Sequence, residues 1–363
     1  MNAAQRLHAL GQSLWLDNIT RGLLTGGTLS GYIADLAITG LTSNPTIFEH
    51  AITETNFYDD AIRNKALDGR SGESLFFDLA VEDLSQAADL FRPIHDATGG
   101  MDGWVSLEVS PLLADDAVAS VNAAVQLHDR AQRPNLYVKI PGTRAGLLAI
   151  EEAVFAGIPV NVTLLFSREQ YVAAAEAYMR GIERRIAAGR DSRVASVASM
   201  FVSRWDLAVK DKVPDRLRNG LGIAIATRTY KAYRELLASP RWQKLAASGA
   251  RPQRLLWAST GTKDPAASDV LYVEALAAPE TINTMPDKTL LAFADHGIVQ
   301  GVMRVDGGDA EAVLADVARQ GVDDQALAAQ LQCDGTAAFA KSWRDVLQTI
   351  AAKSAVLTEA RGA

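Results

Sequence analysis

The chain has 363 residues, of which 48% are hydrophobic and 22% are charged, as in an ordinary globular protein. Its net charge of −7 gives no reason to expect nucleic acid or an anionic membrane as a partner, and no stretch reaches the roughly 18 apolar residues of a membrane span. The first residues lack a basic-then-apolar signal peptide, and the single cysteine, Cys333, excludes an intrachain disulfide. We therefore expect a cytoplasmic protein.

Eight short apolar segments are predicted to be strands. They are Leu14–Asp17, Gly40–Asn44, Trp104–Val109, Leu136–Ile140, Pro159–Leu165, Val194–Phe201, Arg254–Ser259 and Thr281–Met285. Most gaps between them carry helix signals, such as the capping box of Ser167 with Gln170 and a helix stop at Gly189. Eight strands that alternate with helices predict an α/β fold, a (β/α)₈ TIM barrel, with a doubly wound sheet as the rival.

Further helices are predicted over residues 54–92, 205–240 and 286–357. The chain contains neither a low-complexity linker nor an internal repeat beyond the strand–helix alternation. One domain over residues 1–363 is therefore expected, with a barrel over 14–300 and a helical tail over 301–363. Cys333 falls in this tail, where we expect it to pack in a helix.

Polar side chains recur near the carboxyl ends of the predicted strands. In the fourth strand, Tyr137 and Lys139 lie on one face and Leu136, Val138 and Ile140 on the other, because side chains alternate along a strand. The same parity argument predicts a ring around one cavity, since barrel interiors converge at that end. Its members are Asp17, Asn44, Glu108, Lys139, Asn161 and Thr163.

Such a ring suits chemistry through a Schiff base. Burial disfavours the charged form of a lysine, and a neutral amine attacks a carbonyl to form an imine, which accepts the electrons of a breaking carbon–carbon bond. Two carboxylates in different surroundings can then act as the base and as the acid that manages water. Metal chemistry finds little support, because the five histidines form no ligand-spaced pair, and no nucleotide-binding or hydrolase motif is present.

Each residue also has a plainer interpretation. Lys139 could reach solvent from a strand end, Asp17 could cap the next helix, and the Asn44–Pro45 pair could simply form a turn. Glu108 could serve only as a structural partner of Lys139. Thr163 and Ser199 could be core hydroxyls bonded to the backbone. The sequence leaves these alternatives open.

Two segments resemble the signatures of the transaldolase family, within the class I aldolase superfamily. "GLTSNPTIF" (40–48) is similar to the first signature, and "LYVKIPGTRAGLLAIEEAVFAGIPVNVTLLFS" (136–167) is similar to the second. The likeness runs from "LWLDNITR" to "INTMPD" and is closest to the longer bacterial type. It implies a TIM barrel that moves a dihydroxyacetone unit between sugar phosphates without a metal or an organic cofactor.

The resemblance also implies roles for single residues. Lys139 matches the Schiff-base lysine, Asp17 the carboxylate that takes and returns the hydroxyl proton, and Glu108 the acid/base that acts through a water held by Thr163. The residues matching substrate ligands are Asn44, Asn161, Ser199, Phe201, Arg204 and Ser259. Of these, Phe201 favours transfer, since related fructose-6-phosphate aldolases tend to have tyrosine there, and Arg204 matches a phosphate ligand, unless it only pairs with Asp206.

One position departs from the family pattern. In "WASTGTKDP" (257–265), Gly261 stands where many transaldolases have a second phosphate-binding arginine. Lys263 is the nearest cation and our candidate replacement, although lysine lacks the fork geometry of arginine. The plainer interpretation of Lys263 is a loop lysine paired with Asp264.

The function expected from this resemblance is that of a transaldolase in the non-oxidative pentose phosphate pathway. The donor is sedoheptulose 7-phosphate or fructose 6-phosphate, and the acceptor is glyceraldehyde 3-phosphate or erythrose 4-phosphate. The alternatives are a lysine aldolase that releases dihydroxyacetone and a non-catalytic barrel that binds sugar phosphates. The sequence allows a homodimer but does not determine the oligomeric state. It also leaves open the preferred donor and acceptor and whether the chain belongs to a larger fusion.

Overall fold

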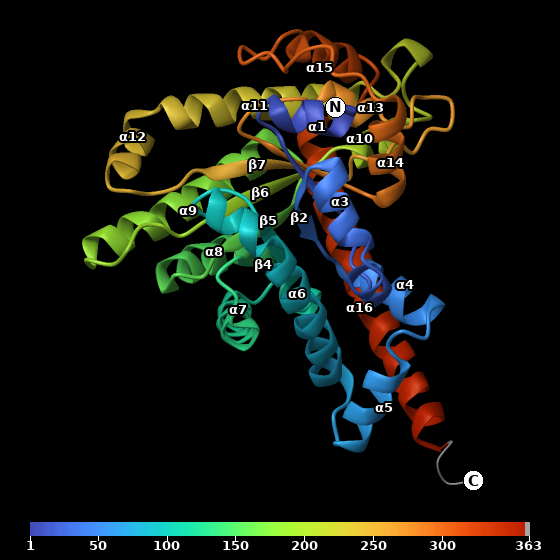
Figure 1. Ribbon diagram of the computed structural model, residues 1–363. Helices are drawn as coiled ribbons and strands as arrows, with labels where there is room; N and C mark the ends of the chain where they lie inside the picture. The colour runs from blue at the N-terminus through green and yellow to red at the C-terminus, as the bar shows by residue number, and fades with distance from the viewer. Residues whose placement is uncertain (360–363) are drawn as a thin grey trace.

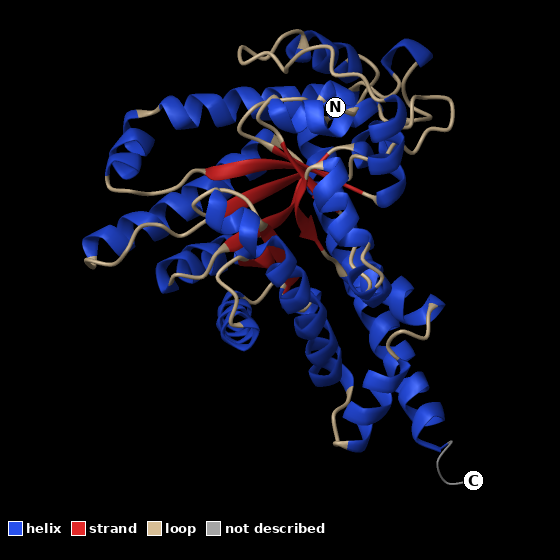
Figure 2. Ribbon diagram, in the orientation of Figure 1, coloured by secondary structure: helices blue, strands red, loops and turns tan. Residues whose placement is uncertain are grey.

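The computed structural model describes residues 1–359, and it shows a closed barrel of eight parallel strands. In chain order the strands are β1 (Ser13–Leu16), β2 (Ile38–Thr42), β3 (Trp104–Glu108), β4 (Leu136–Pro141), β5 (Val160–Leu165), β6 (Ser196–Phe201), β7 (Gln253–Ala258) and β8 (Ile282–Met285). Each strand pairs with the next, and β8 pairs with β1, which closes the sheet at the centre of the molecule (Figure 2). The predicted TIM barrel is confirmed, and each predicted strand overlaps an observed one.

Helices surround this barrel (Figure 1). Between strands they are α2 (Arg21–Thr25), α3 (Thr28–Leu36), α4 (Pro45–Glu54), α5 (Asp59–Leu67), α6 (Gly72–Ala97), α7 (Ala117–Ala131), α8 (Arg144–Ala156), α9 (Arg168–Ala187), α10 (Ser203–Val209), α11 (Leu221–Ala238), α12 (Pro240–Ala247) and α13 (Leu271–Ala275). Helix α1 (Ala3–Ala9) precedes β1, and α14 (Asp287–His296), α15 (Ala310–Ala318) and α16 (Asp324–Glu359) follow β8. Short 3₁₀ turns occur at Pro111–Leu113 and Asp215–Leu217. Within residues 1–359, no helix is both long and apolar enough to cross a membrane.

The ends of α9 follow the sequence signals. The Ser167 hydroxyl accepts a hydrogen bond from the backbone N–H of Gln170 at 3.2 Å, and the Gln170 side chain accepts one from the N–H of Ser167 at 3.3 Å. This is the predicted capping box, which satisfies two of the free N–H groups at a helix start. The helix ends at Ala187, and Gly189 follows with a φ of +68°, a conformation that glycine adopts without steric cost.

Aromatic side chains fill the barrel below the polar ring. Trp104 stacks on Tyr137 with ring centroids 4.1 Å apart, and the Trp15 ring lies 6.1 Å from Tyr137. Gly40 makes room for Trp15, because a Cβ at position 40 would lie 2.7 Å from the indole ring. The interior at this level is thus packed with side chains, as in other TIM barrels.

Strand register places three polar side chains side by side. Glu108 of β3 is aligned with Lys139 of β4, and Lys139 is aligned with Asn161 of β5. After Val162 the register of β5 against β6 shifts, and Leu164 takes a φ of +58°. Such a bulge re-aims side chains near a strand end, here around Thr163.

The predicted helical tail is confirmed as a C-terminal extension, of which residues 360–363 lie outside the described part. Its main element is α16, which packs against α4, α5, α6 and β5 and runs from the barrel along α4 and α5 to the C-terminus (Figure 1). The prediction that Cys333 packs in the core is wrong, since its side chain is exposed on α16. The single-domain organisation stays a prediction.

Candidate active site

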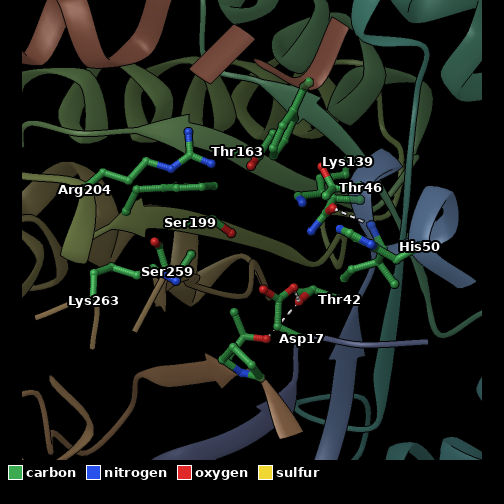
Figure 3. A pocket seen from close by; sticks show the side chains of 17 residues that line it. Asp17, Thr42, Thr46, His50, Lys139, Thr163, Ser199, Arg204, Ser259 and Lys263 are labelled. Carbon is green, nitrogen blue, oxygen red and sulfur yellow. Dashed lines mark hydrogen bonds between the residues drawn. The ribbon is translucent and has the colours of Figure 1, made fainter. Parts of the chain in front are cut away.

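A cavity of about 490 Å³ opens at the carboxyl ends of the strands. Nine of the predicted site residues form its wall, namely Asp17, Asn44, Lys139, Thr163, Ser199, Phe201, Arg204, Ser259 and Lys263. The other two, Glu108 and Asn161, are buried in the strands on either side of Lys139. The structure therefore brings predicted residues from seven different segments of the chain to one place, and Figure 3 shows those that line the cavity.

Lys139 is held deep in this cavity, with an exposed fraction of 4%. Its Nζ lies 3.3 Å from Glu108 Oε2 and donates a hydrogen bond to the Ser43 carbonyl at 3.1 Å. The lysine does not reach solvent, so that plainer interpretation is excluded. The structural pairing with Glu108 does occur, but a buried ion pair is weak evidence for a stabilising purpose, because desolvation offsets its attraction.

Glu108 combines burial with free hydrogen-bonding capacity. Burial raises the pKa of its carboxyl group, and the neighbouring Lys139 charge lowers that pKa in part. The contact with Lys139 lacks hydrogen-bond geometry, so Glu108 Oε2 has no hydrogen-bond partner within residues 1–359, and neither has the buried Thr163 hydroxyl. Buried polar atoms normally have partners, and these two can therefore receive a water or a substrate group.

Asp17 directly follows β1, and its backbone N–H donates to the Met285 carbonyl at 2.8 Å. Its Oδ1 accepts a hydrogen bond from the Thr42 hydroxyl at 2.8 Å. Burial raises the pKa of the Asp17 carboxyl group, while the Lys139 charge and the Thr42 hydrogen bond lower it. Asp17 caps no helix, because Thr20 is the N-cap of α2. The Asp17 carboxylate is thus a half-buried base that faces the cavity.

The two asparagines hold different positions. Asn44 is the N-cap of α4, where its Oδ1 accepts from the Ile47 N–H at 3.1 Å. The Asn44–Pro45 pair thus starts a helix instead of forming a simple turn, and this cap leaves the amide Nδ2 able to donate. Asn161 lies behind the wall, and its Nδ2 donates to Ser106 at 3.0 Å. Its Oδ1 accepts from Ser199 at 2.7 Å. Ser199 is therefore bonded to a side chain and not to the backbone.

Two cations lie on the side of the cavity away from Lys139 (Figure 3). Arg204 is half-buried with its guanidinium 5.0 Å from the Phe201 ring centroid, and its pKa is lowered by burial. Arg204 forms no salt bridge with Asp206, and Lys263 forms none with Asp264. Asp206 is bonded to the backbone of α11 and to Tyr272 instead, and Asp264 is bonded to Asn219. Two cations that form no salt bridge within residues 1–359 are available to bind an anion.

Between the two cations, Ser259 adopts a left-handed backbone with a φ of +56°. Its hydroxyl is hydrogen-bonded to Ser203 at 2.9 Å. A positive φ is uncommon outside glycine and clusters at functional sites, where the surrounding structure holds it in place. The bend at Ser259 ends β7 and starts the loop that carries Lys263 to the rim.

The sequence reasoning missed other residues of the wall, which are Thr42, Thr46, Ile47, His50, Ala258, Thr284, Pro286 and Phe339. The alternation rule could have found Thr42 and Thr284, which lie near the ends of β2 and β8 and are hydrogen-bonded to each other at 2.8 Å. No local signal pointed to Phe339, which lies on α16 and comes to the cavity only through tertiary packing.

The chain is similar to known proteins over nearly its full length. The family model described as transaldolase/fructose-6-phosphate aldolase matches residues 14–350. A relative named transaldolase in Thiobacillus denitrificans is 45% identical over 360 residues, which cover 96% of this chain and 100% of the relative. Relatives with the same name in Frankia alni and a Parafrankia species are 45% and 44% identical, and the matches cover 96% and 95% of this chain and 97% and 96% of theirs.

Proposed function

The chain belongs to the transaldolase/fructose-6-phosphate aldolase family, and from this premise we propose that Lys139 carries a dihydroxyacetone unit from a ketose phosphate to an aldose phosphate. Transaldolase function, a transferase activity predicted from the sequence, is confirmed by the family match and by the shared name of the relatives. The observation that carries the residue assignment is one buried lysine that shares a cavity region with two carboxylates of raised pKa.

The first step is imine formation. The Lys139 amine attacks the ketone carbon of the donor and forms a carbinolamine, whose hydroxyl leaves as water after protonation. Glu108 supports this assignment, because its carboxyl group lies 3.3 Å from Nζ and burial raises its pKa, which makes the carboxylate a stronger proton acceptor. A water between Glu108 and Thr163 would relay these protons, since both groups have a free hydrogen-bonding atom within residues 1–359.

The second step is carbon–carbon cleavage. Asp17 takes the proton of the donor hydroxyl, the bond breaks, and its electrons pass to the iminium nitrogen to form an enamine. The aldose phosphate leaves, and the enamine then attacks the acceptor aldehyde while Asp17 returns the proton. Water finally adds to the new iminium carbon, and the product ketose leaves as the Lys139 amine is restored. The Thr42 hydrogen bond holds the carboxylate in one orientation for both transfers.

Substrate binding divides between the two sides of the cavity. Asn44 Nδ2 and the Ser199 hydroxyl bind the hydroxyls of the dihydroxyacetone unit, and Asn161, already bonded to Ser199, completes this set. Arg204, Lys263 and Ser259 bind the phosphate at the opposite side, and Phe201 supports Arg204 through its ring face. Sedoheptulose 7-phosphate and fructose 6-phosphate are the proposed donors, and glyceraldehyde 3-phosphate and erythrose 4-phosphate the acceptors, in a cytoplasmic pentose phosphate pathway.

A coupled assay tests this function. With fructose 6-phosphate as donor, we expect glyceraldehyde 3-phosphate to accumulate only when erythrose 4-phosphate is added, together with sedoheptulose 7-phosphate. Equal release of glyceraldehyde 3-phosphate without an acceptor would favour the aldolase alternative. The full length of the match to relatives named transaldolase favours transfer.

The fall of kcat/KM at low pH, which is the acid limb of the pH profile, should reflect the protonation of Asp17. The base must be deprotonated, so kcat/KM falls as the pH drops through its raised pKa. Thr42→Val removes a hydrogen bond that lowers this pKa, and the acid limb should therefore move to higher pH. Rates of the wild type and Thr42→Val measured across the pH range check this, and an unmoved limb would assign it to another group.

Lys263 should contribute only to phosphate binding. Lys263→Ala is expected to raise the KM for fructose 6-phosphate about fivefold, a small effect because the side chain is exposed at the rim, and to leave unphosphorylated fructose unaffected. Lys210→Ala is the matched control, since Lys210 is also exposed but lies outside the cavity wall. Equal effects on both donors would contradict the phosphate assignment.

A further inference from the structure

The C-terminal helix α16 forms part of the barrel mouth. Its barrel-facing residues are Gln332, Gly335, Phe339, Ser342 and Trp343, which follow the spacing of one helix face. Gln332 donates to the carbonyls of Gly142 and Leu164 at 3.1 and 3.0 Å. Ser342 is bonded to Thr46 at 2.8 Å, and Trp343 donates to Glu73 at 2.9 Å. This face is therefore anchored to four separate parts of the chain, which are β5, the end of β4, α4 and α6.

The approach of α16 to the site is close. A Cβ at Gly335 would lie 2.9 Å from the Leu164 side chain and 3.3 Å from a guanidinium nitrogen of Arg204. Only glycine lets the helix backbone come this near. The contact lies one helical turn before Phe339, and it sets the depth at which that side chain enters the cavity.

Phe339 touches both charged centres of the site. It is 5% exposed, and its ring centroid lies 5.6 Å from Lys139 Nζ and 5.9 Å from the Arg204 guanidinium. Phe201 faces the same guanidinium from 5.0 Å. The ring of Phe339 thus forms an apolar wall directly beside the atom on which the proposed imine forms.

The enamine on Lys139 has two fates. In transfer, its nucleophilic carbon bonds to the acceptor aldehyde, and the new alkoxide takes a proton. One water then adds to the resulting iminium carbon, which frees the product ketose and restores the lysine amine. In release, the same carbon takes a proton instead, one water adds to the resulting iminium carbon, and free dihydroxyacetone leaves while the lysine amine is restored. Both fates end with the hydrolysis of an iminium, and they differ only in whether the enamine carbon takes a proton or attacks the aldehyde. A group that keeps solvent away from the enamine therefore favours transfer.

We propose that Phe339 is a further specificity-determining residue, beside Phe201, that suppresses release, because it keeps solvent away from the enamine on Lys139. The inference rests on the proposed function, and it assigns this task to a residue outside the barrel strands. The roles proposed above belong to residues of the barrel strands and their loops, whereas Phe339 lies on α16 in the C-terminal extension.

The test compares two rates in each variant. Release is measured as dihydroxyacetone formed from fructose 6-phosphate without an acceptor, and transfer as sedoheptulose 7-phosphate formed with erythrose 4-phosphate. Phe339→Ala should raise the ratio of release to transfer at least about tenfold, and Phe339→Leu, which keeps an apolar side chain, should raise it less. An unchanged ratio in Phe339→Ala would overturn the proposal.

Val346→Ala is the matched control. Val346 is fully buried on the same helix, two turns after Phe339, and does not line the cavity. Its truncation loosens the docking of α16 and should leave the ratio at the wild-type value. A rise equal to that of Phe339→Ala would show that general loosening, and not the ring, controls release. If Phe339→Ala does not fold, the Phe339→Leu ratio decides, and an unchanged value overturns the proposal.

The two proposals fail separately. Wild-type protein that forms no transfer product and no reducible adduct on Lys139 contradicts the proposed function. Wild-type protein that transfers normally, with a ratio insensitive to position 339, contradicts only the inference about Phe339.

Discussion

Lys139→Ala should abolish turnover, with kcat lowered about 100,000-fold or more, as when an enzyme loses its nucleophile. Without the amine no imine forms, and the electrons of the breaking bond have no acceptor. Borohydride added to the wild type with fructose 6-phosphate should reduce the imine and leave a permanent mass increment on residues 136–143. The same treatment of Lys139→Ala should leave this peptide unmodified.

The fold is expected to survive this change. Removing one partner of a buried ion pair is costly when the other charge stays behind, but the raised pKa of Glu108 lets that carboxyl group take a proton instead. Circular dichroism and thermal melting check the fold. Lys139→Arg is the control that keeps a positive charge without a nucleophilic amine, and it should be as inactive as Lys139→Ala. A borohydride-reduced adduct on a peptide elsewhere in the chain would refute the assignment of Lys139 as the residue that forms the imine.

Asp17→Ala should lower the rate of carbon–carbon cleavage by about 100-fold to 10,000-fold, the usual contribution of a positioned general base. Imine formation does not need Asp17 and should persist. The imine of the intact donor would then accumulate, because it forms but does not break down. Borohydride trapping should therefore capture the whole sugar phosphate on Lys139, where the wild type yields mainly the three-carbon adduct.

The mass of the trapped adduct makes this prediction specific. Asp17→Asn is the control that keeps the size and the Thr42 contact but removes the base, and it should trap the same intact donor. A three-carbon adduct in both variants would mean that cleavage proceeds without Asp17. Loss of all trapping would mean that Asp17 acts earlier, in imine formation.

The two carboxylates differ in their surroundings, which suits their different tasks. Glu108 is buried beside Lys139 in the adjacent strand, and the positive charge next to it changes when the imine forms. Asp17 lies beyond a strand end, partly exposed to the cavity and oriented by Thr42. One is thus placed to exchange protons at the nitrogen and the other to meet a substrate hydroxyl, which the adduct experiments separate.

Much of this site could be predicted from the sequence because strand periodicity is local. The alternation of polar and apolar residues around Lys139 depends only on neighbouring positions, and the carboxyl ends of parallel strands must meet at one end of a barrel. The same reasoning placed Asp17, Asn44 and Thr163 at the cavity, and the structure has them there.

Other features could not be predicted in this way. The bonding of Asn161 to Ser106 and Ser199, rather than to open cavity, depends on the side chains of two other strands. The exposure of Cys333 depends on which face of α16 meets the barrel. Helical spacing shows that a helix has an apolar face but does not say where that face docks.

The sequence by itself determined the barrel and its eight strands, and it supplied the candidate groups for the proposed chemistry, since these follow from local patterns and two family signatures. Only the tertiary structure decided what surrounds those groups: the free oxygen of Glu108, the bonding of Asp206 to α11 and Tyr272 and not to Arg204, and the ring of Phe339 beside Lys139. The physical reason is distance along the chain. Contacts between residues 200 positions apart depend on packing of whole elements, which no local pattern records.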